Sequence, residues 1–94
     1  MLKRMYVVFD TCSGVHDNPW PAVNDDTAIR SFGQAVLDED HPIGKNPEHF
    51  ALRFVGIFDD ASGVIVPADP VETVVTALEL SAKLKPAQFG VGNA

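Results

Sequence analysis

The segment from residue 50 to residue 58 places the strongest constraint on the fold, because it is apolar on both faces of an expected strand. One face is mainly aromatic and consists of Phe50, Leu52, Phe54 and Phe58. The other face is aliphatic apart from one cation and consists of Arg53, Val55 and Ile57. Such a strand is usually central in its sheet or covered on both sides. The chain must therefore build a sheet around this segment.

Two further strands are predicted. Residues 3–11 are rich in Val, Phe and Tyr and are typical of a buried strand. After residue 58, a hairpin loop over residues 59–63 leads into a short strand at 64–66, which Pro67 ends. We expect Gly63 to have a positive φ in this loop. We also expect Gly56 to lie where a helix or another chain closely approaches the sheet.

Two helices are predicted from capping signals and apolar periodicity. The first starts at Asn24–Asp26, where Asn24 is a suitable cap, and its apolar stripe ends near residue 39. Gly33 in its interior indicates close packing. The second helix is expected over residues 70–85, because Asp69, Pro70 and Glu72 match a capping box with proline at the first helical position.

The resulting order is β-α-β-β-α, an α/β (α+β) fold with a small three-stranded sheet and both helices on one face, like a truncated ferredoxin-like fold. Residues 1–85 form this single domain, and residues 86–94 are expected to be a flexible C-terminal tail. The uncovered sheet face would expose Phe and Leu side chains, which favours self-association into a homo-oligomer.

Composition restricts the classes of function. The 94 residues carry a net charge of −6, so the overall field repels DNA, and contact with nucleic acid requires a local basic patch, base stacking or a partner that supplies the charge. Cys12 is the only cysteine, which fits the cytosol. Apolar runs are short, so we expect neither a signal peptide nor a membrane span.

Candidate catalytic and metal centres are weak. Phe9-Asp10-Thr11 followed by small residues is similar to the aspartic-protease signature, but Cys12 stands where that signature needs a very small residue. The alternative is that Asp10 ends a strand and bonds the following turn. Asp10, Cys12, His16 and Asp17 match no strong zinc spacing. We therefore expect no enzyme activity, no metal and no cofactor, with a retroviral-type aspartic protease as a remote alternative.

A nucleic-acid interface is the other candidate site. The cations expected on ordered structure could combine with aromatic rings to stack and hold single-stranded nucleic acid. These residues are Arg4, Arg30, Lys45, Arg53, Tyr6, Trp20 and Phe54. The alternative is that the rings belong to the core and the cations only solubilise the protein. We expect Arg30, in the first helix, to have a polar partner or a subunit contact.

Several segments together resemble a known family. They are Val8-Phe9-Asp10, Pro19-Trp20, the helix segment Ala28-Ile29-Arg30-Ser31-Phe32, the segment Asn46-Pro47-Glu48-His49-Phe50-Ala51-Leu52, and the hairpin Val55-Gly56-Ile57-Phe58-Asp59-Asp60-Ala61-Ser62-Gly63. Over roughly residues 3–82 this order resembles the small non-structural protein of gokushovirus-like Microviridae, which are single-stranded DNA bacteriophages. The loop at residues 12–23 follows no pattern of that family, and its role is open.

The resemblance implies a phage accessory protein without catalytic activity that acts in the cytoplasm of the infected bacterium. It implies single-stranded DNA binding or help in genome synthesis and packaging. Two hypotheses follow. In one, the protein binds single-stranded DNA through its arginines and aromatic rings. In the other, it is an oligomeric adaptor that binds phage or host replication or assembly proteins and contacts DNA little.

Overall fold

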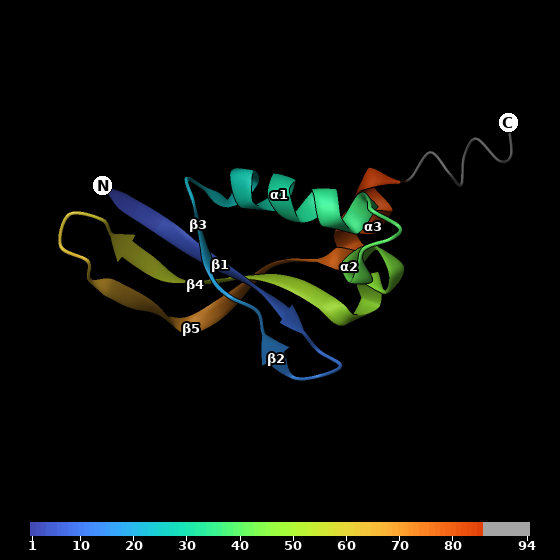
Figure 1. Ribbon diagram of the computed structural model, residues 1–94, viewed down its shortest axis with the longest axis horizontal. Coiled ribbons are helices and arrows are strands. Elements are labelled where there is room, and N and C mark those ends of the chain that lie inside the picture. The colour runs from blue at the N-terminus through green and yellow to red at the C-terminus, as the bar shows by residue number, and fades with distance from the viewer. Residues whose placement is uncertain (86–94) are drawn as a thin grey trace, which may run out of the picture.

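The computed structural model describes residues 1–85; residues 86–94, for which we predicted a flexible tail, lie outside the described part. The fold is mixed α+β, as predicted, with a single antiparallel sheet and helices on one of its sides (Figure 1). The strands are β1 (Leu2–Asp10), β2 (Val15–His16), β3 (Trp20–Ala22), β4 (Phe50–Asp59) and β5 (Ile65–Thr76). The helices are α1 (Asp25–Leu37), α2 (Pro42–Lys45), the 3₁₀ turn η1 (Pro47–His49) and α3 (Ala77–Leu84).

The doubly apolar segment forms β4, which is central as predicted. It pairs with β1 on one side and β5 on the other, in the order β2-β1-β4-β5. The sheet has five strands and not three, because the loop after β1 folds back twice on the outer edge of β1. β2 pairs near Phe9, and β3 pairs near Tyr6.

The predicted helix over residues 70–85 is wrong in its first half. β5 continues past Pro67 and through Asp69 and Pro70 to Thr76, and α3 begins only at Ala77. The run from 71 to 76 is Val-Glu-Thr-Val-Val-Thr, and its β-branched side chains favour a strand over a helix. The observed capping box lies further along the chain, at Thr76 and not at Asp69, where Thr76 Oγ1 accepts from Glu79 N at 3.1 Å.

The first helix is confirmed, including its cap. Asn24 Oδ1 accepts from Thr27 N at 2.9 Å and satisfies an N–H of the first turn. Gly33 is buried, and a Cβ there would lie 3.3 Å from a methyl carbon of Leu84 on α3. The glycine therefore allows α1 and α3 to pack closely, as its position in the helix interior indicated.

The core lies between the helices and one end of the sheet. Its buried members are Tyr6, Ala28, Phe32, Val36, Ile43, Leu52, Ala77 and Leu80. At the other end of the sheet, the end of β4 pairs with the start of β1 and the start of β5, and we call this region the ribbon end. None of the buried core residues comes from residues 56–67, which form its β4–β5 hairpin. In Figure 1 this region extends away from the helices, next to the N-terminus.

The distribution of exposed apolar side chains corrects one expectation. No phenylalanine in the described part of the chain is among the exposed large hydrophobic residues. Exposed apolar side chains gather instead at the ribbon end, at Met1, Leu2, Val64, Ile65 and Val66. Exposed apolar surface is therefore concentrated at one end of the sheet and is not provided by phenylalanine side chains over its uncovered face.

Two glycines and a proline shape the ribbon end. Gly63 has φ +77° in the hairpin turn, as predicted. A Cβ at Gly56 would lie 2.5 Å from Val66 O, so the close approach is confirmed, but the neighbour is the β5 backbone and not a helix. Asp59 N donates to Val64 O at 2.9 Å. Because hydrogen-bonded and non-hydrogen-bonded pairs alternate along this register, the N-substituted side of Pro67 faces the free edge of β5.

Candidate nucleic-acid interface

The two faces of the sheet carry different candidate residues. Directly paired residues of antiparallel strands lie on the same face, and successive residues alternate between faces. Tyr6 and Phe54 are paired on the face that the helices cover, which we call the helix face. Val7 is paired with Arg53 on the opposite side, which we call the open face. The seven predicted residues therefore do not form one site.

Four of them meet on the helix face, beside the start of α1. The Arg4 guanidinium carbon lies 4.0 Å from the centre of the Phe54 ring. Arg4 Nε donates to Tyr6 Oη at 2.8 Å, and Arg4 Nη2 lies 3.2 Å from Asp25 Oδ1. The Tyr6 ring centre is 6.4 Å from that of Trp20. This cluster joins the start of β1 to the first turn of α1.

The cluster is satisfied within the protein. Tyr6 Oη donates to Asp25 Oδ1, and the Tyr6 side chain is fully buried. Burial, followed by the hydrogen bond to Asp25, raises the pKa of Tyr6. The hydrogen bond with Tyr6 is the largest cause that raises the pKa of Arg4. The buried Tyr6 ring is out of reach of a base, and Arg4 already has Asp25 as an ion-pair partner.

Arg30 and Lys45 are exposed on separate helices. Arg30 lies on α1 and Lys45 on α2. Within residues 1–85, neither cation forms an ion pair or a side-chain hydrogen bond, and the Asp26–Arg30 helix pair that the spacing allows is not made. The polar partner expected for Arg30 is therefore not found among residues 1–85, and the expected subunit contact stays a prediction.

Arg53 belongs to a different cluster, on the open face. Its guanidinium carbon lies 5.3 Å from the Phe9 ring centre, and its Nη1 lies 3.0 Å from His16 Nε2. The His16 ring stacks on Phe9 with 4.3 Å between ring centres. Since arginine only donates, His16 Nε2 is the acceptor of this bond. The three side chains form a layer of cationic and aromatic groups.

Sequence reasoning missed Phe9 and His16. Strand alternation from Tyr6 would have placed Phe9 on the face opposite Tyr6 and Trp20. No sequence signal places His16 beside Arg53, because β2 has only two residues and lies in a stretch that the sequence predicts as a loop. The Arg53 Nε is buried and has no hydrogen-bond partner among the described residues, which leaves the guanidinium incompletely satisfied.

The open face differs from the rest of the protein in charge. Among the paired residues that share this face, none is acidic; they are Lys3, Met5, Val7 and Phe9 of β1, Ala51, Arg53, Gly56 and Phe58 of β4, and Ile65, Pro67, Thr73 and Thr76 of β5. The Lys3 Nζ lies 3.6 Å from Asp60 Oδ2 in the hairpin turn, so Arg53 is the cation without a carboxylate partner on this face. The lack of carboxylates at these paired positions favours the approach of a phosphate to an otherwise acidic protein.

The side chains considered as catalytic or metal candidates lie at the end of β1 and in the segment that follows it. Asp10 Oδ1 accepts from Cys12 N at 2.9 Å and from Ser13 N at 3.4 Å, which is the turn-stabilising role given as the alternative to a protease. Cys12 is an exposed thiol. In the part of the chain that the structure describes, no three His, Cys, Asp or Glu residues gather in a way that could hold a metal ion.

Comparison with known proteins identifies a family. No helix among residues 1–85 combines the length and the apolar character that crossing a bilayer requires. Neither the curated proteins nor the solved structures gave a match to the chain. The family model described as "Phage ORF5 protein" matches residues 3–80, which covers the strands, apart from the first residue of β1, and the first half of α3. The chain therefore belongs to the Phage ORF5 protein family.

Proposed function

We propose that this phage protein is a non-catalytic accessory protein of a gokushovirus-like Microviridae phage that binds single-stranded DNA in the host cytoplasm during genome synthesis or packaging. The contact surface is the open face of the sheet. The observation that carries the proposal is the Phe9–His16–Arg53 cluster on a face whose paired residues include no carboxylate. The family match supports a phage protein, and the resemblance to single-stranded DNA phage proteins supports the ligand.

The cluster supplies the two kinds of contact that single-stranded DNA requires. The exposed His16 ring has one face against Phe9, so its other face is available to a base. Arg53 offers guanidinium donors to a phosphate, and its stacking on Phe9 fixes the plane of the group. Stacking contributes about 1–3 kcal/mol per base, so a site with one ring and one arginine binds weakly and without base specificity.

Binding of a fluorescent oligothymidine, followed by anisotropy across a salt series, tests this function. We expect Arg53→Gln to weaken binding about tenfold and to lower the slope of log K against log salt by about one, because one phosphate contact is lost. Arg30→Gln makes the same charge change on α1 and should leave both values unchanged. Equal losses in the two variants, or no binding by the wild-type protein at low salt, would refute the proposal.

A second function, an oligomeric adaptor, is favoured by the ribbon end. Met1, Leu2 and Ile65 are 77%, 70% and 60% exposed, respectively. Burying one large apolar side chain stabilises an interface by about 1.5–3 kcal/mol, and salt screens the opposing charge of −6 per subunit. Self-association should therefore strengthen with salt, whereas DNA binding weakens. Light scattering across the same salt series separates the two, and a monomer at every salt concentration would contradict the adaptor.

A further inference from the structure

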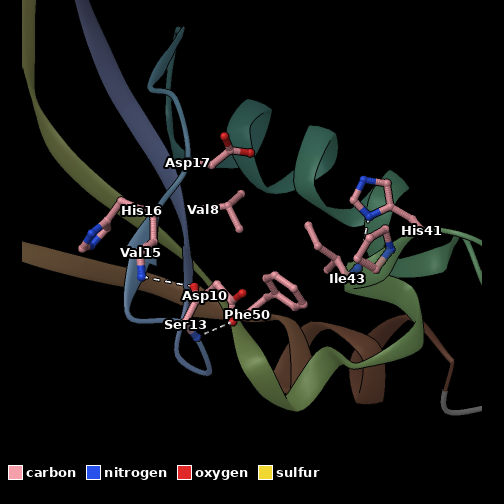
Figure 2. Close-up of a pocket in the computed structure, with 10 residues that line it drawn as sticks. Val8, Asp10, Ser13, Val15, His16, Asp17, His41, Ile43 and Phe50 are labelled. Carbon is pink, nitrogen blue, oxygen red and sulfur yellow. Dashed lines mark hydrogen bonds between the residues drawn. The ribbon is translucent and has the colours of Figure 1, made fainter.

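A pocket lies at the β1–β2 hairpin, and Figure 2 shows the residues that line it. His16 of the Phe9–His16–Arg53 cluster is among them, whereas Phe9 and Arg53 are not. It has a volume of about 370 Å³ and lies between this hairpin and α2. Its apolar wall includes Val8, Ile43 and Phe50. The helix-face pair Asp10–Val15 follows the open-face pair Phe9–His16 directly in register, so one short hairpin borders both sites.

The charged side chains of this pocket are acidic. Asp10 and Asp17 line it, and none of its lining residues is Lys or Arg. Asp10 uses Oδ1 for the turn after β1, and Asp17 uses Oδ1 to accept from Asn18 N at 2.8 Å. The Oδ2 atom of each carboxylate remains for a ligand. Figure 2 shows the Asp17 and Asp10 side chains on either side of Val8.

His41 completes the rim. Its Nδ1 accepts from Ile43 N at 3.1 Å and caps α2. This bond holds the His41 ring in place at the edge of the pocket. The pocket combines an apolar wall, two partly unsatisfied carboxylates and no fixed cation.

We propose that this pocket binds an arginine side chain of a basic protein partner. The methylene stem would pack against Val8 and Phe50, and the guanidinium would bond to Asp10 and Asp17. Two carboxylates repel phosphate, so DNA is excluded from the pocket, whereas the net charge of −6 attracts a basic segment. The hairpin then holds an anion on one face and a cation on the other, and the protein can join single-stranded DNA to a basic protein.

The test is a titration of the full-length, isotope-labelled protein with the peptide acetyl-Gly-Arg-Gly-amide, followed by backbone amide NMR. Signals of Ser13, Val15 and Ile43 should shift. The same peptide with citrulline in place of arginine is neutral and nearly isosteric, and it should bind at least about tenfold more weakly because the charge-assisted bonds are lost.

Matched variants locate the site. Asp17→Asn keeps the local Oδ1 acceptor but loses the charge, and we expect affinity for the arginine peptide to fall about tenfold. Asp10→Asn should act in the same direction. Asp26→Asn removes one charge from the first turn of α1 and should change affinity less than about twofold, since it acts only through long-range, screened charge.

The outcomes are decisive and independent of the DNA proposal. Equal binding of the citrulline peptide, equal effects of Asp17→Asn and Asp26→Asn, shifts confined to residues outside the pocket, or no shift at all would overturn the inference. Arg53→Gln should weaken peptide binding far less than Asp17→Asn, because Arg53 does not line the pocket and meets it only through its bond to His16. If the protein fails to bind oligothymidine, the peptide titration still decides whether the pocket takes arginine.

Discussion

The two ends of the sheet are built from the same three strands, yet they are held together differently. At the covered end, Leu52 and Tyr6 are fully buried beneath α1 and α3. At the ribbon end, the strands are joined by backbone pairing and by exposed contacts, such as that of the N-terminal amino group with Asp60 at 2.6 Å. Exposed ion pairs contribute little. Stability is therefore concentrated at the covered end, and the ribbon end is free to present apolar side chains.

The contrast between the two ends would be wrong if truncating a core side chain and a ribbon-end side chain lowered the free energy of unfolding equally. We expect Leu52→Ala to lower the free energy of unfolding by about 2–5 kcal/mol, because it leaves a cavity in the core. Ile65→Ala should cost less than about 0.5 kcal/mol, since the side chain is 60% exposed. Denaturant unfolding followed by the fluorescence of Trp20 measures both. Similar losses would mean that the ribbon end contributes to the core.

Substitutions at two glycines test how closely the backbones of β4 and β5 approach within the ribbon end. Gly56→Ala should destabilise the protein by about 1–3 kcal/mol, because the new Cβ meets backbone atoms of β5 that cannot rotate away. Gly63→Asn serves as the control, since no atom lies within 4 Å of a Cβ there and Asn tolerates a positive φ. Its cost should be within about 0.5 kcal/mol. An equal cost for both variants would show that the close approach at Gly56 is not real.

The smallest effect concerns the polar cluster at the covered end. The chain has one tyrosine, so near-ultraviolet tyrosinate absorbance reports Tyr6 alone. Asp25→Asn should lower the pKa of Tyr6 toward its ordinary value, because Asp25 contributes to raising it. A raised pKa means that the stabilisation is complete below about pH 10 and is lost as pH rises through the pKa of the folded state. Asp26→Asn should leave the titration unchanged, and a higher pKa in Asp25→Asn would contradict the assignment.

The sequence predicts those elements whose local signals, such as apolar periodicity and helix caps, agree with the tertiary contacts that the segment makes. β4 and α1 were found because apolar periodicity, length and the Asn24 cap point to the same element. The start of the last helix was misplaced because Asp69, Pro70 and Glu72 form a valid local cap, whereas pairing with β4 keeps the chain extended to Thr76. Tertiary pairing overrode a local signal in this case.

The candidate site was less accessible to prediction. Arg53 was selected as a cation on ordered structure, but its neighbours Phe9 and His16 come from segments far from it in sequence. The aromatic residues chosen with it, such as Tyr6, lie on the opposite face, because a helix layer covers one side of the sheet only. Which face a ring occupies depends on the register between β1 and β4, and composition does not encode that register.

Pro67 limits which contacts the free edge of β5 can make with another strand. Its ring occupies the outer side of β5, where an incoming strand would need an amide hydrogen. Addition of a further strand is therefore disfavoured at this point of the β5 edge, beside exposed apolar side chains. A contact through Ile65 at this edge would rest on its side chain and not on added strand pairing.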